Sequence, residues 1–303
     1  MQNFTTILSK HTIKEIDKRL SQYRLRKPNN PHLSYFYKID NTTISIFTNG
    51  KLLIQGENAK QLYDSLIGDE KKIDYKKVYK NTSLESANGY IGCDEVGVGD
   101  YFGGLVTCAV YLKKKSEQIL KSIGVRDSKD LSDSDMLAMY PKIMRVCEIE
   151  TYVTSPNEYN QLVNRFKNTH IVKAYMHDTT IKKLVNKIRS TEKLIPIVMD
   201  QFVARNAYYA YFKKFNIEPY EITHFETKAE NKYLAVAAAS IVARVIFIKQ
   251  VQELSIKSHI PLLLGASNPK IISQAKLIYQ QGGMNKLKQF AKIDFATTKK
   301  VIV

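Results

Sequence analysis

The stretch that decides the fold is YIGCDEVGVGD at residues 90–100. It starts as an apolar run. Two adjacent acids, Asp94 and Glu95, follow this run, and Gly97 and Gly99 come after them. A second apolar run at 102–112 comes after the glycine-rich turn, so we predict two paired strands. Neighbouring residues on a regular strand face opposite sides. If both acids serve one site, we expect the backbone to leave regular β geometry there, which the glycines permit.

The acids themselves indicate a cation site. Two adjacent carboxylates repel each other unless a cation or a proton compensates them, and Mg²⁺ prefers such hard oxygen ligands. A solvated strand end explains the same pair without any function. Asp200 closes the apolar run 195–199, and Glu230 precedes an apolar segment. Asp200 has an equally good explanation without function, because aspartate commonly ends strands. Glu230 has one too, because residues 227–230 fit a capping box.

The segments after residue 90 predict a mixed α/β layer domain, because paired strands are followed by strands that alternate with helices. Further strands are expected at 148–154 and 195–200, and helices at 171–193, 202–215 and 231–254. The last helix is apolar nearly all round, which is typical of a helix buried inside a domain.

The first 66 residues predict a separate small α+β module. Strands are expected at 4–9, 33–39, 42–48 and 51–55, and helices at 12–23 and 58–66. Asn49-Gly50 is a two-residue hairpin signal, and Thr12 with Glu15 fits a capping box. We therefore predict a domain at 1–66, an exposed linker at 67–89 and a second domain at 90–303.

The composition indicates an anionic partner. Lys and Arg number 46 against 29 Asp and Glu, a formal net charge of +17, and such a surface attracts polyanions, nucleic acid above all. A Lys-rich surface that only keeps the protein soluble is the alternative. The three cysteines form no CxxC pair, which favours buried reduced thiols. With no signal peptide and no uncharged apolar run of about 18 residues, we expect a cytoplasmic protein that binds no membrane. No protein partner is inferred from the sequence, and a monomer is the default expectation.

Six blocks of the chain, in order, resemble the type 2 ribonuclease H family. They are DEVGVGDYFG at 94–103, RDSK at 126–129, MDQF at 199–202, KAE at 228–230, AAASIVAR at 237–244, and AK at 291–292 with TTK at 297–299. The resemblance covers residue 90 to the end. Residues 1–66 are similar to the N-terminal module, with a TATA-binding-protein-like fold, that one branch of the family carries. Gly104, where proline is expected, and residues 293–295 depart from the family pattern.

The resemblance implies a ribonuclease H-like catalytic domain with a metal-binding catalytic quartet of Asp94, Glu95, Asp200 and Glu230. Two Mg²⁺ or Mn²⁺ ions per active site are implied as cofactors. Substrate-binding roles are implied for Gly97, Val98, Gly99, Ser128 and Lys129. The implied activity is endonucleolytic hydrolysis of the RNA strand of RNA/DNA hybrids, leaving 5′-phosphate and 3′-hydroxyl ends.

Two alternatives stay open from the sequence. One is cleavage at single ribonucleotides in DNA, as in the ribonuclease HII branch of the family. The N-terminal module and Val98, in place of the arginine common in that branch, favour the other branch. The second alternative is a nucleic-acid-binding protein without activity, against which the intact set of four acids argues.

Overall fold

The computed structural model describes residues 2–8, 10–25, 30–67, 84, 87–188 and 195–302. The chain divides into two compact units, Met1–Asn81 and Thr82–Val303. Most of the linker predicted at 67–89 lies outside the described residues. The domain boundaries at 66 and 90 therefore stay a prediction.

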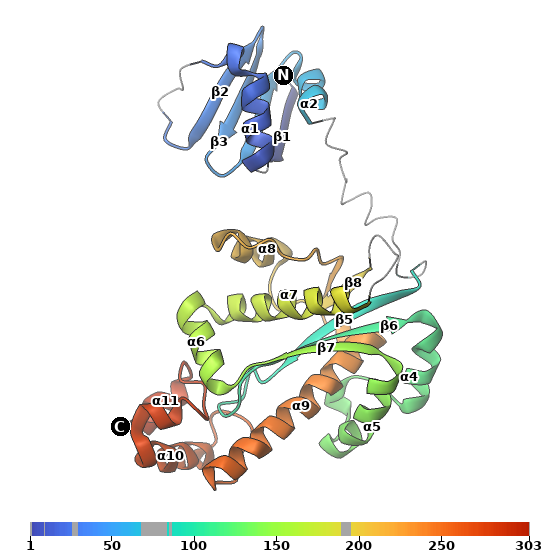
Figure 1. The fold of residues 1–303 in the computed structure, drawn as a ribbon, viewed down its shortest axis with the longest axis vertical. Coiled ribbons are helices and arrows are strands. Elements are labelled where there is room, and N and C mark those ends of the chain that lie inside the picture. The colour runs from blue at the N-terminus through green and yellow to red at the C-terminus, as the bar shows by residue number, and fades with distance from the viewer. Residues whose placement is uncertain are drawn as a thin grey trace. The chain divides into compact units, whose positions relative to one another are not determined.

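The first unit is a four-stranded antiparallel sheet with two helices (Figure 1). Its elements are β1 (Gln2–Ile7), α1 (Lys10–Arg19), β2 (Leu33–Ile39), β3 (Thr42–Phe47), β4 (Lys51–Gly56) and α2 (Ala59–Ile67). The strand order is β1-β4-β3-β2. β3 and β4 form the predicted hairpin, but three residues, 48–50, join them rather than the two expected. Gly50 has a φ of 82°, whereas Asn49 does not have a positive φ, so the connection is not the two-residue Asn-Gly turn. The alternating apolar residues of β3 and β4 bury Ile44 and Ile54 completely, so the expected small α+β fold is confirmed.

One local prediction in this unit is wrong. Helix α1 begins at Lys10, so Thr12 lies inside the helix, 6% exposed. An N-cap residue needs a non-helical backbone, and the capping box expected from Thr12 and Glu15 therefore does not start this helix. The α-helix ends at Arg19, and a 3₁₀ turn over Ser21–Tyr23 completes the predicted segment.

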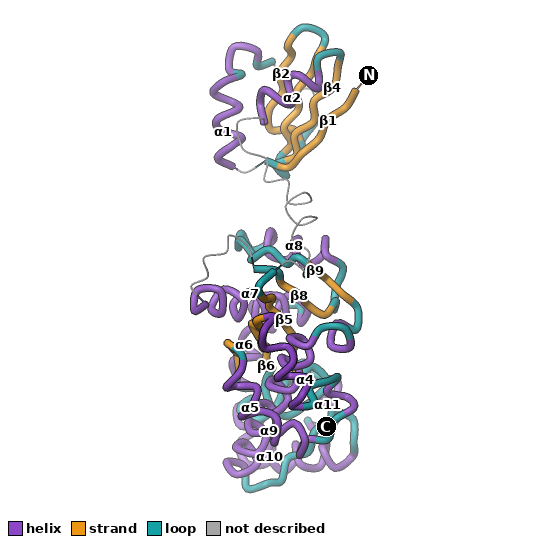
Figure 2. The backbone as a smooth tube through the Cα atoms, turned by 90° about the vertical axis from the view of Figure 1, so that its right-hand side faces the viewer, coloured by secondary structure: helices purple, strands orange, loops and turns teal. Residues whose placement is uncertain are grey.

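The second unit is a mixed five-stranded sheet with helices on both faces (Figure 2). Its strands are β5 (Gly89–Val96), β6 (Val106–Lys113), β7 (Glu148–Val153), β8 (Ile197–Asp200) and β9 (His224–Glu226). Its helices are α4 (Glu117–Ile123), α5 (Asp133–Val146), α6 (Pro156–Phe166), α7 (Thr169–Ile188), α8 (Arg205–Lys214), α9 (Leu234–Ser258), α10 (Pro269–Leu287) and α11 (Ala296–Val301). The order is β7-β6-β5-β8-β9, antiparallel from β7 to β5 and parallel from β5 to β9. This is the predicted mixed α/β architecture.

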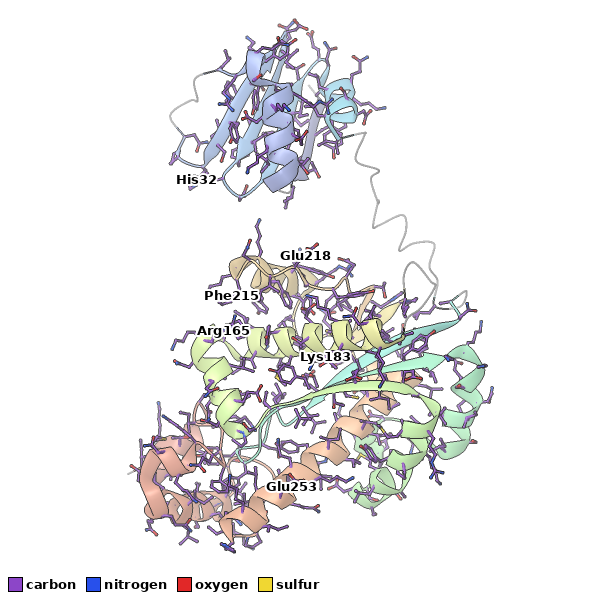
Figure 3. All side chains as sticks on the ribbon, viewed as in Figure 1. His32, Arg165, Lys183, Phe215, Glu218 and Glu253 are labelled. Atoms are coloured by element: carbon purple, nitrogen blue, oxygen red, sulfur yellow. The ribbon has the colours of Figure 1, made fainter. Side chains whose placement is uncertain are left out.

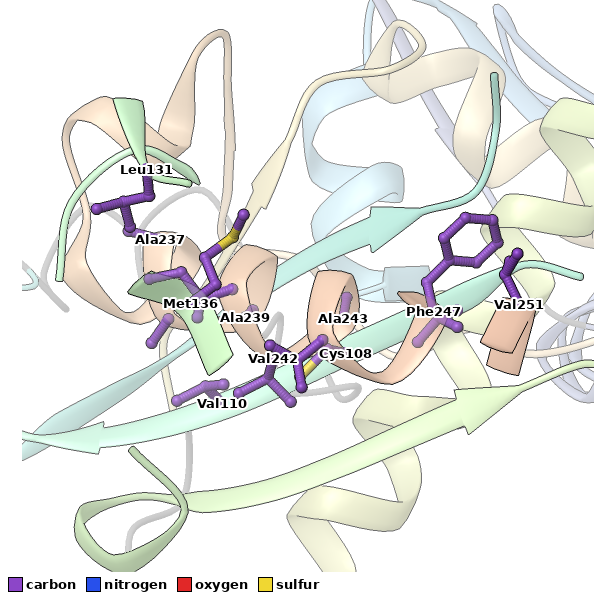
Figure 4. Close-up of a cluster of buried hydrophobic side chains, with 14 of the residues drawn as sticks. Cys108, Val110, Leu131, Met136, Ala237, Ala239, Val242, Ala243, Phe247 and Val251 are labelled. Atoms are coloured by element: carbon purple, nitrogen blue, oxygen red, sulfur yellow. The ribbon is translucent and has the colours of Figure 1, made fainter. Parts of the chain in front are cut away.

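The two faces of this sheet have separate apolar cores, which side chains fill (Figure 3). On one face, Cys108 and Val110 of β6 pack under Val242 of α9, while Leu131, just before α5, and Met136, in the first turn of α5, pack against α9 (Figure 4). On the other face, α7 and α8 cover alternate residues of β5 and β8. Successive strand residues therefore point into different cores.

Helix α9 is the central helix of the unit. By length and composition it is the one candidate membrane span among the described residues, yet 72% of its most apolar window is buried within the protein. It packs along β5 and β6 (Figure 1). Its apolar character is thus explained by burial within the unit, as the sequence predicts.

Gly92 allows α9 to approach β5 closely. A Cβ atom at Gly92 would lie 2.3 Å from the backbone carbon of Ala235 and 2.3 Å from the backbone nitrogen of Val236. The hydroxyl of Tyr90, two residues earlier, accepts a hydrogen bond from the nitrogen of Ala235 at 3.3 Å. The first turn of α9 is therefore fixed against β5, just before the strand reaches Asp94.

Gly92→Ala is expected to destabilise the protein by about 2 kcal/mol, because the added methyl group forces backbone against backbone. Gly99→Ala is the matched control, since a Cβ atom there would meet nothing within 4 Å. Urea unfolding followed by circular dichroism measures both variants, as the chain has no tryptophan. If Gly92→Ala and the wild type have the same free energy of unfolding, the close backbone contact between β5 and α9 does not contribute to stability.

Candidate active site

A cavity of about 500 Å³ opens where β5 and β8 end. All nine residues singled out by sequence line it, namely Asp94, Glu95, Gly97, Val98, Gly99, Ser128, Lys129, Asp200 and Glu230. Its far wall includes Arg244 of α9, whose Nε donates to Asp133 Oδ1 at 3.0 Å. The structure therefore gathers side chains from positions 94 to 244 into one acidic cavity of a basic protein.

The two adjacent acids reach this cavity from opposite faces of a regular strand. The pairing of β5 with β6 continues in register through Asp94↔Cys108 and Glu95↔Thr107. The expectation that the backbone leaves β geometry at the acids is therefore wrong. The pairing between β5 and β8 ends at Cys93↔Met199. Past that point both faces of β5 border the cavity, so the two carboxylates serve it from either side.

Asp94 is an acid of the cavity whose pKa is raised. It lies on the α9 side, with hydrogen bonds from the nitrogen of Glu95 at 2.8 Å and from the side chain of Ser240. Burial is the main cause that raises the pKa of Asp94 to about 8, and the charges of Glu95 and Asp200 raise it further. The carboxyl group therefore favours a proton or a cation beside it.

Glu95 lies on the α7 side and is held by two partners. Lys173 Nζ is 2.9 Å from Oε1, and His177 Nε2 is 2.8 Å from Oε2. Burial alone would raise the pKa of Glu95, but the hydrogen bond and charge of His177, with the ammonium of Lys173, lower it to about 2. Neighbouring acids on one strand thus have pKa values shifted in opposite directions.

The other two acids come from β8 and from the 3₁₀ turn Ala229–Asn231 before α9. Asp200 Oδ1 accepts a hydrogen bond from the nitrogen of Ala229 at 3.1 Å, which ties the two segments together. Glu230 is 9% exposed, and its Oε1 is 2.7 Å from Lys129 Nζ. The capping-box explanation for Glu230 is wrong, because α9 starts after Tyr233 with no side-chain cap.

Ser128 and Lys129 lie on a 3₁₀ turn, Ser128–Asp130, that docks on α9. The hydroxyl of Ser128 is 2.8 Å from that of Ser240, and Asp127 Oδ1 accepts from the nitrogen of Lys129 at 3.0 Å. The side chain of Lys129 remains 76% exposed despite its contact with Glu230. Its ammonium is thus both fixed at the acids and accessible from the cavity.

The glycine loop, residues 97–104, forms the rim. Gly97 has a φ of 104°, and a Cβ atom there would lie 2.7 Å from the carbonyl oxygen of Gly104. This position therefore requires glycine. Val98 is 48% exposed, so the loop presents its side chain and the backbone beside it to solvent.

Lys292 anchors the loop from the interior. It is completely buried, and its Nζ donates to the carbonyl oxygens of Gly103 and Gly104, each at 2.9 Å. Burial lowers the pKa of Lys292 to about 7. The departure at Gly104 has a steric reason, because a Cβ atom there would lie 1.9 Å from the carbonyl oxygen of Thr154.

Sequence reasoning missed Lys173, His177 and Ser240, and did not give Lys292 a role. A usable signal existed for the first two, since residues four apart on a helix share one face. Their partner Glu95 is about 80 residues away, and nothing local identifies it.

The donor set has the chemistry of a divalent cation site. Carboxylate oxygens are the ligands that Mg²⁺ and Mn²⁺ prefer. Burial raises the pKa of Asp94 most, and the charges of Glu95 and Asp200 raise it further, so a cation beside this carboxyl group is favoured. Within the described ranges, however, no three Asp, Glu, His or Cys side chains are arranged as they stand to hold one ion. Glu95 and Glu230 each place one oxygen beside an ammonium. The donor set therefore fits a divalent cation in its chemistry.

Comparisons with known proteins agree with this picture. The sequence model of the family described as Ribonuclease HII matches residues 91–298, and one described as a domain of unknown function (DUF3378) matches residues 3–77. A Ribonuclease HIII from Bacillus anthracis is 35% identical over 99% of this chain and 98% of its own length. One from Ureaplasma parvum is 33% identical over 97% of both chains.

Solved structures show the same fold. The crystal structure of Bst-RNase HIII in complex with Mn²⁺ has a TM-score of 0.67 and 27% identity, covering 99% of this chain and 98% of that one. The ribonuclease H2 from Pyrococcus horikoshii OT3, with a TM-score of 0.56 and 23% identity, shares the fold over 70% of this chain. The class is therefore that of the type 2 ribonucleases H.

Within that class, two observations distinguish the ribonuclease HIII branch from the ribonuclease HII branch. They are the relatives that match over the full length of the chain and the presence of the N-terminal unit. The chain belongs to the ribonuclease HIII family. The ribonuclease HII-like alternative is not favoured, since the HII model leaves the first 90 residues unmatched.

Asp94→Asn is expected to stabilise the protein at alkaline pH in the presence of chelator. Between the ordinary pKa of 3.8 and about 8, the folded state binds more protons than the unfolded state, so wild-type stability falls as pH rises through this window. The Asn side chain of the variant does not ionise. Its free energy of unfolding is therefore expected to exceed that of the wild type by about 2 kcal/mol at pH 9, and by less toward pH 5. Urea unfolding at several pH values measures this, and a pH-independent difference would contradict it.

Proposed function

We propose that this chain is a divalent-metal-dependent endoribonuclease that hydrolyses the RNA strand of RNA/DNA hybrids, leaving 5′-phosphate and 3′-hydroxyl ends. The observation that carries the proposal is the convergence of Asp94, Glu95, Asp200 and Glu230 on one cavity beneath the glycine loop. The relative of known structure was solved with Mn²⁺, and relatives over the full length are named Ribonuclease HIII. The proposal includes a cytoplasmic enzyme that acts as a monomer.

The four carboxylates are the residues that would hold two ions. Bound divalent cations supply Lewis-acid stabilisation of the phosphodiester and lower the pKa of water in the site. No side-chain nucleophile is then needed. The residues of the chain have the task of binding and orienting the scissile phosphate against these carboxylates.

Two features of the cavity suit that task. The exposed ammonium of Lys129, with the hydroxyl of Ser128, can contact a backbone phosphate next to the acids. The rim formed by Gly97, Val98 and Gly99 lets backbone groups approach a ribose closely, where the 2′-hydroxyl distinguishes RNA from DNA.

Asp94→Asn is expected to lower the rate of hybrid cleavage at least about a hundredfold, or about 2.7 kcal/mol of transition-state stabilisation, with hybrid affinity nearly unchanged. Asp130→Asn is the matched control, because Asp130 is exposed beside the site and does not line the cavity. A labelled hybrid is incubated with Mg²⁺, Mn²⁺ or chelator. A D94N variant that cuts at the normal rate, or wild-type cleavage in chelator, would refute the assignment.

Removal of residues 1–81 is expected to weaken hybrid binding and to flatten its salt dependence. Residues 1–66 carry ten Lys and Arg against five Asp and Glu. For each phosphate that the shortened protein no longer neutralises, the slope of log affinity against log salt becomes shallower by about 0.7–0.9. The turnover rate at saturating hybrid should persist, since the cavity residues all lie in the second unit. Unchanged affinity and salt slope would remove this role from the N-terminal unit.

A further inference from the structure

Helix α7 buries four polar side chains, Lys173, His177, Asp178 and Thr180. Lys173 is 8% exposed and His177 is 1% exposed, and both contact Glu95, a contact that the proposed chemistry does not use. The same helix places Ala174, Ile181 and Leu184 in the core against β5 and β8. A buried ammonium is costly unless it is paired. Such a group at this position needs an explanation.

We propose that Lys173 and His177 are positioning residues for Glu95, and that the Lys173 charge sets the affinity of the four-acid cluster for divalent cations. This inference rests on the proposed function. Neither residue was identified by the sequence resemblance.

The geometry fixes the carboxylate of Glu95 at both oxygens. Lys173 Nζ contacts Oε1 at 2.9 Å, and His177 Nε2 contacts Oε2 at 2.8 Å. The two partners are one helical turn apart, so the rigid helix sets the separation between them. With one partner on each oxygen, rotation of the carboxylate about its terminal bond breaks both contacts.

Phe202 encloses this arrangement and links it to Asp200. Lys173 Nζ lies 4.2 Å from the centre of the Phe202 ring, and the His177 ring stacks on the same ring at 5.8 Å with an interplanar angle of 20°. Phe202 follows Asp200 by two residues, just after β8. The side chains of Lys173 and His177 thus pack against the segment that carries Asp200.

The charge of Lys173 acts on any cation at Glu95. An ammonium within hydrogen-bond distance of a ligand repels a divalent ion at the same ligand, and the repulsion is strong where water is largely excluded. Lys173 therefore orients Glu95 while it weakens cation binding at the cluster. Its removal should tighten cation binding and lower turnover, because the ligand is then free to rotate.

The test compares Lys173→Met, which removes the charge, with Lys173→Arg, which keeps it, in the full-length protein. Lys182→Met is the control on the same helix, since Lys182 pairs with Asp178. Mn²⁺ binding to chelator-treated protein is measured by calorimetry, and kcat and KM are measured on a hybrid. For K173M we expect Mn²⁺ binding about tenfold tighter, because the repulsion by the ammonium is removed. We expect kcat about tenfold lower, because Glu95 loses a partner that orients it, with KM for hybrid unchanged. K173R and K182M should bind Mn²⁺ as the wild type does.

Each other outcome counts against the inference. Unchanged or weaker Mn²⁺ binding by K173M, or equal behaviour of K173R and K173M, would overturn it. If K173M does not fold, Lys173→Gln replaces it, because an uncharged amide can still donate to Glu95 and the same tighter binding is expected. Wild-type protein that neither binds Mn²⁺ nor cuts hybrid refutes the proposed function. If the wild type binds Mn²⁺ and cuts hybrid, and K173M has the same Mn²⁺ affinity and the same kcat, only this inference is refuted.

Discussion

Repulsion between carboxylates at the end of one strand is the constraint on which the site depends. Asp94 and Glu95 are adjacent on β5, and Asp200 ends the neighbouring strand β8. The fold separates the first two by strand alternation, so that each meets a different core. Ionised acids so close together are tolerated only with compensating cations or protons. The surrounding helices supply part of that compensation.

Compensation comes from both faces of the sheet. On the α7 side, Lys173 and His177 satisfy Glu95, whereas on the α9 side Lys129 satisfies Glu230. Asp94 has hydrogen bonds, yet its pKa is raised, whereas that of Glu95 is lowered. The resulting asymmetry gives each acid a distinct environment, and it leaves negative charge for which a divalent cation is the natural counterion.

Tight packing of backbone on backbone makes this arrangement rigid. Gly92 places the first turn of α9 against β5, and Gly104 fits beneath Thr154 with no room for a side chain. Lys292 closes the same loop from inside. The positions of Glu230 and of the glycine loop thus follow from close contacts that larger side chains cannot make.

The sequence by itself determined most strands, the acids at their ends, the buried helix α9 and the small N-terminal α+β unit, because these are local patterns of apolar periodicity and turn chemistry. The prediction started β6 at 102 instead of Val106, and it did not include β9 or the helices α4, α5, α6, α10 and α11. Resemblance by motif added the joint membership of Asp94, Glu95, Asp200 and Glu230 in one set. Only the tertiary structure decided how Asp94 and Glu95 share a cavity from a regular strand, and that Lys173 and His177 hold Glu95. Those contacts join segments about 80 residues apart across the sheet, and such pairings depend on packing that no local pattern encodes.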